Sequence, residues 1–389
     1  MVEKPVDFYC SQKFTWLSVD LEKRLSYSCC SASPEKIDIN WLQQNPGELF
    51  NTPGLHQDRI DMLNNQPVPS CHEACWKPES SGLASRRTVM NSHVPTHDNI
   101  DEKIPTQLNI TLGSTCNLTC SYCCKQYSSA WYRDLRDNGS YIDNQDRYQL
   151  VAIDHVLAKL SHSEYLNSNG ANILIQEISK LDRAEEVRIT GGEPFLYNEF
   201  PDLLNGLDRS GGVSFYTGLG VDTKRLQKQL ARIKSRNNLQ VIVSAENCGK
   251  SYEFNRYGNN YKVFLANLKL LTDSGFFVKF NSVVSNLTVF GLAEFAETFK
   301  NVPVIYQFCN SPDFLAVNVL DDFSKEKLIR ILEQGSIPMR NTIIQNILVK
   351  PTQEQQQNCA KFVKEFARRR KLDLDIFPNS MLEWLNYVV

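Results

Sequence analysis

The sequence lacks any apolar run of about eighteen residues or more, which argues against a membrane-spanning helix. Its first residues, Met1 to Pro5, also lack the basic-then-apolar pattern of a secretory signal, so we expect a cytoplasmic protein. Neither sign of charge dominates: the net charge is -2 and the pI is about 6.3. The chain therefore has no basic field that would attract nucleic acid or an anionic membrane. Internal repeats and low-complexity tracts are absent too, and the 389 residues, 42% of them hydrophobic, suffice for two or three structural units.

Cysteine, in contrast, is abundant, with twelve residues. Without a secretory signal, metal or redox use explains so many cysteines better than disulfides do. The cysteines are also clustered in the sequence: Cys10, Cys29, Cys30, Cys71 and Cys75 form one group, Cys116, Cys120, Cys123 and Cys124 a second, and Cys248, Cys309 and Cys359 are single. We expect the single ones to be ordinary buried thiols.

Four regions follow one another along the chain. We expect a small, irregular, cysteine-bearing domain over residues 1–90, a polar linker over 91–106, an alternating strand–helix domain over 107–320 and a helical extension over 321–389. Within the first region, residues 15–19 and 25–27 predict a short hairpin. In the last, Thr352 and Gln355 predict a capped helix that ends at a basic run, 368–371, which we interpret as a solvated face.

The central region predicts six strands separated by helices. The strands are expected at residues 108–112, 187–190, 213–217, 239–244, 276–281 and 304–308. Helical spacing marks residues 150–160 and 261–271, and a further helix is expected from about Thr223. Strands and helices that alternate at these lengths predict βαβ units with a parallel sheet. The fold class is therefore α/β, a partial (β/α)6 barrel of the TIM type, whose active site lies at the C-terminal ends of the strands.

The clearest chemistry lies in Cys116, Cys120 and Cys123, which follow the first of these strands at a C-x3-C-x2-C spacing. Thiolates are the ligands of iron–sulfur clusters, and three on one short loop can hold three irons of a cubane, with the fourth left to a non-protein ligand. A structural zinc site is the alternative, with a fourth ligand such as Cys124, although adjacent residues rarely ligate one ion together. The segment Gly191-Gly192-Glu193-Pro194 after the next strand favours the cluster, because zinc gives no reason for it.

These two motifs together resemble those of the radical S-adenosylmethionine (SAM) superfamily. Its C-x3-C-x-aromatic-C motif is matched by Cys116, Cys120, Tyr122 and Cys123, and its Gly-Gly-Glu-Pro motif by Gly191, Gly192, Glu193 and Pro194. The resemblance implies a [4Fe-4S] cluster whose open iron binds SAM, with the second motif holding the amino end of the methionine. Weaker matches after the fourth strand imply further SAM contacts for Ser244, Glu246 and Arg256.

The N-terminal cysteines carry a second resemblance, to the auxiliary iron–sulfur module called twitch, which is related to SPASM. It implies a second [4Fe-4S] cluster on Cys10, Cys29, Cys71 and Cys75, with Cys30 competing with Cys29 for one place. In most relatives the module follows the barrel, whereas here it precedes it. A structural zinc site with the same four ligands is the alternative.

The resemblance implies an enzyme that cleaves SAM reductively to a 5′-deoxyadenosyl radical, which abstracts a substrate hydrogen. A one-electron donor of the flavodoxin or ferredoxin type is implied as partner, and neither a membrane nor nucleic acid is expected. We expect modification of a peptide or protein, by cross-linking, epimerisation or oxidation. The alternative is dehydrogenation or rearrangement of a small molecule such as an aminosugar, nucleotide or pterin. A non-enzymatic protein with zinc at both cysteine groups is the hypothesis from a different class.

Overall fold

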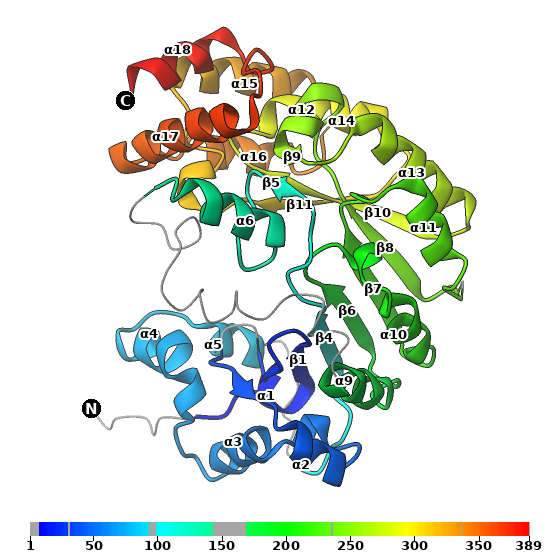
Figure 1. Cartoon of the computed structure of the whole chain (residues 1–389). Coiled ribbons are helices and arrows are strands. Elements are labelled where there is room, and N and C mark those ends of the chain that lie inside the picture. The colour runs from blue at the N-terminus through cyan, green and yellow to red at the C-terminus, as the bar shows by residue number, and fades with distance from the viewer. Residues whose placement is uncertain are drawn as a thin grey trace.

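A nine-stranded sheet with the strand order β11-β10-β8-β7-β6-β4-β1-β2-β3 forms the centre of the molecule (Figure 1). The computed structural model describes residues 8–29, 32–92, 99–142, 169–234, 236–335 and 337–388. The strands are β1 (Trp16–Asp20), β2 (Leu25–Tyr27), β3 (Glu35–Lys36), β4 (Gln107–Thr111), β5 (Thr119–Cys120), β6 (Glu186–Thr190), β7 (Gly212–Thr217), β8 (Leu239–Ser244), β9 (Arg256–Tyr257), β10 (Phe277–Val284) and β11 (Val304–Phe308).

Helices precede, cover and follow this sheet. They are α1 (Gln12–Thr15), α2 (Ile39–Gln44), α3 (Pro53–Leu63), α4 (Lys77–Ser80), α5 (Arg86–Asn91), α6 (Ser129–Asn138), α9 (Asn169–Ser179), α10 (Phe200–Gly206), α11 (Thr223–Leu230), α12 (Gly249–Asn255), α13 (Tyr261–Asp273), α14 (Leu292–Thr298), α15 (Asp322–Gln334), α16 (Arg340–Ile347), α17 (Gln353–Arg370) and α18 (Asn379–Tyr387). Short helical turns are η1 (Leu49–Asn51), η2 (Pro69–Cys71), the π-helical η3 (His72–Trp76), η5 (Pro194–Leu196), η6 (Val289–Gly291) and η7 (Asp313–Leu315). Across the described ranges, every helix is too short or too polar to cross a membrane.

The six strands predicted for the central region are β4, β6, β7, β8, β10 and β11, and each runs parallel to its neighbour in sequence order. This confirms the α/β fold with a parallel sheet. The helices predicted from Thr223 and over 261–271 are α11 and α13. The helix predicted over 150–160 lies outside the described residues.

The N-terminal region extends the same sheet. Strand β1 pairs in parallel with β4, so that Leu17 lies opposite Leu108 and Val19 opposite Ile110. Strand β2 pairs antiparallel with β1, which confirms the predicted hairpin, and β3 adds one more antiparallel strand. Hydrogen bonding therefore continues from the cysteine-bearing N-terminal region into the central region, a connection that the sequence did not predict. The predicted boundaries at 90 and 106 remain a prediction.

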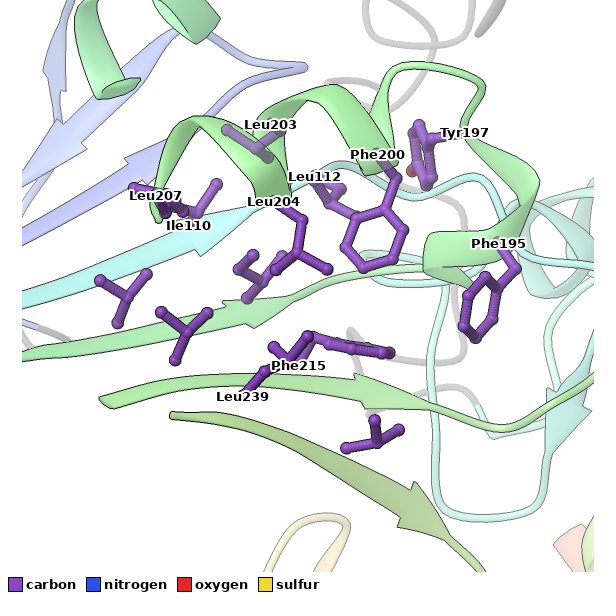
Figure 2. Close-up of a cluster of buried hydrophobic side chains, with 14 of the residues drawn as sticks. Ile110, Leu112, Phe195, Tyr197, Phe200, Leu203, Leu204, Leu207, Phe215 and Leu239 are labelled. Atoms are coloured by element: carbon purple, nitrogen blue, oxygen red, sulfur yellow. The ribbon is translucent and has the colours of Figure 1, made fainter. Parts of the chain in front are cut away.

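The two faces of the sheet differ in polarity. In β6, Val187 and Ile189 are fully buried, whereas Arg188 between them is exposed. Because side chains alternate between the faces of a strand, one face carries the apolar core and the other the polar residues. Figure 2 shows the apolar side, where Phe200 of α10 packs between β-strand residues and the ring of Phe195. The ring centroids of Phe200 and Phe215 lie 5.0 Å apart in an edge-to-face contact.

The described part of the C-terminal extension, which the sequence predicted to be helical, contains helices α15 to α18. The predicted capping box is confirmed, because the Thr352 side chain accepts from the Gln355 amide and Gln355 reaches back to the Thr352 amide. The interpretation of the basic run as a solvated face holds for Arg368 and Lys371, which are exposed, and was wrong for the two residues between them. The side chains of Arg369 and Arg370 are each only 4% exposed and both lie within ion-pair distance of Asp134.

Candidate functional site

A cavity of about 650 Å³ opens on the polar face of the sheet, at the C-terminal ends of its strands. The predicted site residues that line it are Cys116, Cys120, Tyr122, Cys123, Gly191, Gly192, Glu193, Ser244 and Arg256. Glu246 and Pro194 are buried and do not belong to its lining. The fold thus gathers nearly all the motif residues, which are spread over some 140 positions of sequence, around one space.

The three thiols of the cysteine loop face this common space. Burial, together with neighbouring Cys124, Cys120 and Cys116, raises the pKa of the Cys123 thiol well above its ordinary value. Burial likewise raises the pKa of Cys116 to about 12. Thiols that share a buried space in this way favour a cationic centre, which offsets both the desolvation and the mutual repulsion of the thiolates. This donor set fits an iron–sulfur cluster.

Binding of one metal ion requires that the donor atoms of several side chains converge on one point. In the parts of the chain that the structure describes, no three His, Cys, Asp or Glu side chains are grouped so that they could hold a single metal ion. A cubane cluster does not require the three thiol sulfurs to converge on one point, because each thiolate binds its own iron.

The start of helix α6 holds the cysteine loop in place. Ser129 donates its hydroxyl to the Cys116 carbonyl at 3.0 Å and accepts from the Cys116 amide at 3.2 Å. Ser128, the N-cap of α6, donates to the Leu118 carbonyl at 2.6 Å. The indole of Trp131 donates to the Cys120 carbonyl at 2.9 Å. Several backbone groups of the loop are thus satisfied by side chains, which fix the loop whose three cysteines line the cavity.

Gly191 and Gly192 pack directly against this loop. Their φ angles are +88° and +53°, values that L side chains rarely adopt. A Cβ atom on Gly192 would lie 2.3 Å from the Thr115 carbonyl oxygen. The next amide, that of Glu193, donates to the same Thr115 oxygen at 2.9 Å. The glycines therefore allow the two motif loops to approach closely and to join by a backbone hydrogen bond.

Glu193 connects the ends of β6 and β7. Its carboxylate accepts from the Thr217 hydroxyl at 2.7 Å and from the Gly218 amide at 2.9 Å. Burial raises the pKa of Glu193, and these hydrogen bonds act in the opposite direction. A Cβ on Gly218 would come within 3.6 Å of the same carboxylate. Glu193 is thus a fixed acceptor in the cavity wall.

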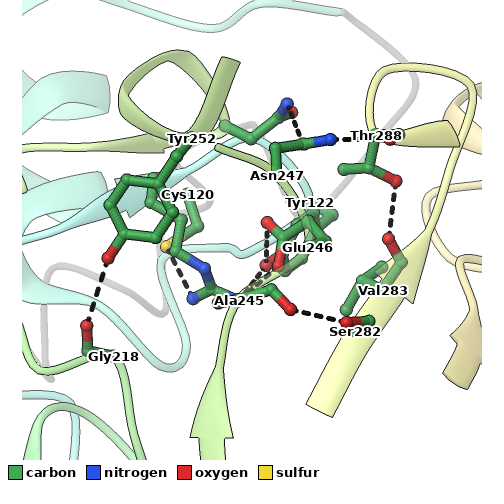
Figure 3. Close-up of polar contacts among 12 residues, drawn as sticks. Cys120, Tyr122, Gly218, Ala245, Glu246, Asn247, Tyr252, Ser282, Val283 and Thr288 are labelled. Atoms are coloured by element: carbon green, nitrogen blue, oxygen red, sulfur yellow. Dashed lines mark hydrogen bonds and ion pairs between the residues drawn. The ribbon is translucent and has the colours of Figure 1, made fainter. Parts of the chain in front are cut away.

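Buried Arg256 and Glu246 form a polar cluster with half-buried Tyr122 beside Cys120. Figure 3 shows Glu246, Tyr122 and Cys120 in this cluster. The guanidinium of Arg256 forms an ion pair with Glu246 at 2.9 Å and contacts the Tyr122 hydroxyl. The Tyr122 hydroxyl in turn donates to Glu246 at 2.9 Å. Arg256 also donates to the Cys120 sulfur at 3.7 Å. A cation is therefore fixed next to one of the thiols, where it stabilises the thiolate form that a metal requires.

Sequence reasoning missed the polar residues that the strands themselves contribute to the cavity. They are Ser18, Asp20, Lys23 and Tyr27 of the N-terminal hairpin, Asn109 and Thr111 of β4, Arg188 and Thr190 of β6, Tyr216 of β7 and Asn281 of β10. The available signal was the alternation of polar and apolar residues within β4 and β6. The contribution of the hairpin had no such signal, because it depends on the pairing of β1 with β4.

The N-terminal cysteines form a second buried group. Cys10, Cys29, Cys71 and Cys75 are all buried, and Cys10, Cys71 and Cys75 share a small apolar cluster. Burial raises the pKa of Cys10 to about 11 and that of Cys71 to about 12, and the other thiols of the group add to both shifts. The structure thus brings the four predicted ligands together. Cys30 lies outside the described residues.

Comparison with known proteins gives a match to the family model described as "Radical SAM superfamily" over residues 110–301. The GTP 3′,8-cyclase of Synechocystis sp. is 26% identical over 201 residues, which cover 50% of this chain and 51% of that enzyme. The chain thus matches about half the length of this curated relative.

The solved structures that resemble this chain are less similar to it in sequence. Streptococcus suis SuiB bound to precursor peptide SuiA is 12% identical, with a TM-score of 0.32 and coverage of 94% of this chain and 71% of that one. The structure of anSMEcpe with bound AdoMet is 18% identical, with a TM-score of 0.32 and coverage of 52% and 51%. Likeness at this level says nothing about the reaction or the substrate of this chain.

Proposed function

We propose, from the premise that residues 110–301 belong to the radical SAM superfamily, that the cavity is the active site of a radical SAM enzyme. The observation that carries the proposal is the contact between the two motif loops, in which the Glu193 amide donates to the Thr115 carbonyl beside Cys116. The proposal is further supported by the cavity lining, which includes Gly191, Gly192 and Glu193 together with the three cysteines.

The chain's own residues would divide the binding tasks. Cys116, Cys120 and Cys123 would hold a [4Fe-4S] cluster, and Gly191, Gly192, Glu193 and Pro194 would shape the adjacent SAM site. Arg256, held by Glu246 and Tyr122, would keep a positive charge beside the Cys120 sulfur. When bound, the cluster and SAM supply reductive cleavage to a 5′-deoxyadenosyl radical that abstracts a substrate hydrogen. Ser244, which lies on the cavity wall at the end of β8, would contribute a hydroxyl to the SAM site.

A second cluster is part of the proposal. Cys10, Cys29, Cys71 and Cys75 would hold an auxiliary [4Fe-4S] cluster of the twitch or SPASM kind, supported by their joint burial. The buried ammonium of Lys13 contributes to the electrostatics there, because it lowers the pKa of Cys71 against the effect of burial. Lys13 is itself held by Asp58 and by the Ser70 hydroxyl at 2.8 Å.

For the substrate we propose a peptide or protein, altered by cross-linking, epimerisation or oxidation, with electrons from a flavodoxin- or ferredoxin-type donor in the cytoplasm. A small molecule is the second candidate. The name of the Synechocystis relative, GTP 3′,8-cyclase, points to a nucleotide, and the polar side chains that the strands contribute to the cavity suit a small polar substrate.

The decisive measurement is iron and sulfide per chain after anaerobic reconstitution, followed by SAM cleavage with a chemical reductant. Two cubanes require about eight irons per chain, and one requires about four. Replacement of Cys116, Cys120 and Cys123 by Ala should abolish SAM cleavage and leave the N-terminal cluster's signal. Replacement of Cys71 and Cys75 should abolish the N-terminal cluster's signal and leave SAM cleavage. SAM cleavage retained in the first variant, or zinc in place of iron at both groups, would overturn the proposal.

A further inference from the structure

The polar face of the sheet forms a continuous floor on one side of the cavity. Ser18 of β1 lies opposite Asn109 of β4, which lies opposite Arg188 of β6. Two residues further along these strands, Asp20 lies opposite Thr111, and Thr111 lies opposite Thr190. All six of these residues line the cavity. Neighbouring strands are about 4.8 Å apart, so the floor is about 10 Å wide from β1 to β6.

This floor lies apart from the fourth and fifth strands of the central region. Ser244 of β8 and Asn281 of β10 also line the cavity, but β7 separates those strands from β6 in the sheet. Tyr216 of β7 lines the cavity between these strands, so the N-terminal hairpin and the first two central strands form the wall on one side of it, and β8 and β10 the wall on the other. Two walls with different side chains can hold two different molecules, a cofactor and a substrate.

A cation borders each side of the floor. Lys23 follows β1, with its ammonium 3.4 Å from Asp20 and its side chain 30% exposed. Burial is the largest single effect on Lys23 and opposes its charge, but Asp20, Tyr27 and Glu22 together outweigh it and raise the pKa of Lys23, so it is protonated at neutral pH. Arg188 on β6 forms an ion pair with Glu186 at 2.6 Å and leaves 46% of its side chain exposed.

The floor offers hydrogen-bond donors more than free acceptors. The one carboxylate among its six residues, that of Asp20, already accepts from the Lys23 amide at 2.8 Å and faces the Lys23 ammonium. Its other side chains are three hydroxyls, an amide and a guanidinium. An ion pair at 3.4 Å is longer than a direct hydrogen bond, so the Lys23 ammonium retains donor capacity for a ligand.

We propose that this floor is the substrate subsite and that Lys23 and Arg188 bind an anionic group of the substrate, a carboxylate or a phosphate. The inference rests on the proposed function, because it takes the cavity as the place where the substrate meets the cofactor. It makes the N-terminal hairpin part of the substrate site, in addition to any role of the N-terminal cysteines. It also requires that the substrate carry at least one negative charge.

The test uses the reconstituted, SAM-saturated holoenzyme, titrated calorimetrically at low ionic strength. Inorganic pyrophosphate is the probe for a phosphate source and succinate the probe for a carboxylate source. We expect one of them to bind, and Lys23→Met and Arg188→Met each to weaken that binding at least about tenfold, as expected when one charge-assisted contact is lost. Lys23→Arg and Arg188→Lys retain the charge and should restore most of the binding.

The chain offers matched controls. Lys269, an exposed residue of helix α13 paired with Asp273 at 2.8 Å, and Arg232, paired with Asp202 at 2.7 Å, lie outside the cavity lining. Their Met variants should bind the anion like the wild type. The subsite is overturned if neither anion binds, if the cavity variants bind as well as the controls, or if the anion binds only when SAM is left out, since the floor would then belong to SAM.

Failure of the subsite and failure of the proposed function give different results. Formation of 5′-deoxyadenosine by the wild-type preparation reports the function independently of anion binding. Cleavage of SAM without anion binding overturns the subsite alone. Anion binding that depends on Lys23 and Arg188, in a preparation that does not cleave SAM, overturns the proposed function and retains the subsite's anion chemistry.

Discussion

The guanidinium of Arg370 donates through Nε to the Thr119 hydroxyl at 3.1 Å, which joins the end of α17 to the loop that carries the three motif cysteines. The same guanidinium donates to the Tyr141 hydroxyl at 2.6 Å and lies 3.8 Å from the centre of the Phe366 ring. The C-terminal extension thus supports the backbone beside Cys120, although it contributes no side chain to the cavity lining. Arg370 is a positioning residue for the cysteine loop.

Replacement of Arg370 by Met should destabilise the protein by about 2–4 kcal/mol, because it leaves buried polar partners without their donor. It should also lower the iron content after reconstitution, since the loop loses its external support. Urea unfolding and iron analysis measure the two effects. Arg368→Met is the matched control on the same helix, where the side chain is 71% exposed and should contribute less than about 0.5 kcal/mol. Equal effects of the two substitutions would contradict this role of Arg370.

The packing of Gly192 against the cysteine loop leads to a second prediction. Gly192→Ala should strongly reduce iron binding, because the new Cβ would lie 2.3 Å from the Thr115 carbonyl and must displace backbone. Gly249 has the same φ of +53°, but a Cβ atom added there would meet no atom within 4 Å. Gly249→Ala therefore reports only the cost of the left-handed backbone, about 1 kcal/mol. If iron content falls equally in both variants, backbone strain and not loop contact explains the glycine.

The ion pair between Arg256 and Glu246 leads to a third prediction, which concerns stability. Arg256→Met leaves a buried carboxylate without its cation and should cost about 3–5 kcal/mol of the free energy of unfolding. Adding Glu246→Gln removes that uncompensated charge, so the double variant should be more stable than Arg256→Met alone. Chemical denaturation of the wild type, both single variants and the double variant forms the cycle. Strictly additive losses would show that the two side chains are not coupled.

The sequence predicted the central sheet well, because each strand is a short apolar or alternating run followed by a helix. The first strand, around Leu108 and Ile110, and the fourth, around Val241 and Val243, both lie where the pattern placed them. The positions of Cys116 and Gly192 at one cavity also followed, because parallel strands end at the same edge of the sheet.

Long-range pairings were not predictable in the same way. Trp16 and Gln107 are paired across β1 and β4, yet nothing in either segment specifies that partner. The pairing changes the N-terminal hairpin into a wall of the cavity and so brings Lys23 into the site.

The basic run at 368–371 shows a second limit. Charge composition alone favoured solvent, whereas Arg369 and Arg370 are buried because Asp134 and Tyr141 lie beside them in space. Burial of a charged residue depends on a partner from a distant segment, and a local pattern cannot show that partner.

The last prediction concerns the pH dependence of stability at α17. Hydrogen bonds from Arg368, followed by those from Arg369, lower the pKa of Glu365 from 4.5 to about 2, although burial acts in the opposite direction. A carboxylate whose pKa is depressed in the folded state stabilises the fold above its unfolded value. That stabilisation is lost as the pH falls from about 4.5 towards about 2. Its side chain is 28% exposed, so solvent screening reduces the contribution to about 1 kcal/mol.

Glu365→Gln should therefore lower the urea midpoint at pH 7, and its difference from the wild type should shrink as the pH falls below 4.5 towards 3. Glu326→Gln is the control, because Glu326 forms a 3.8 Å pair with Arg330 in which both side chains are at least 70% exposed. Such an exposed pair contributes little at any pH. A difference for Glu365→Gln that stays constant from pH 7 to pH 3 would contradict the electrostatic account. The loss would then reflect hydrogen-bond geometry that the neutral amide cannot reproduce at either pH.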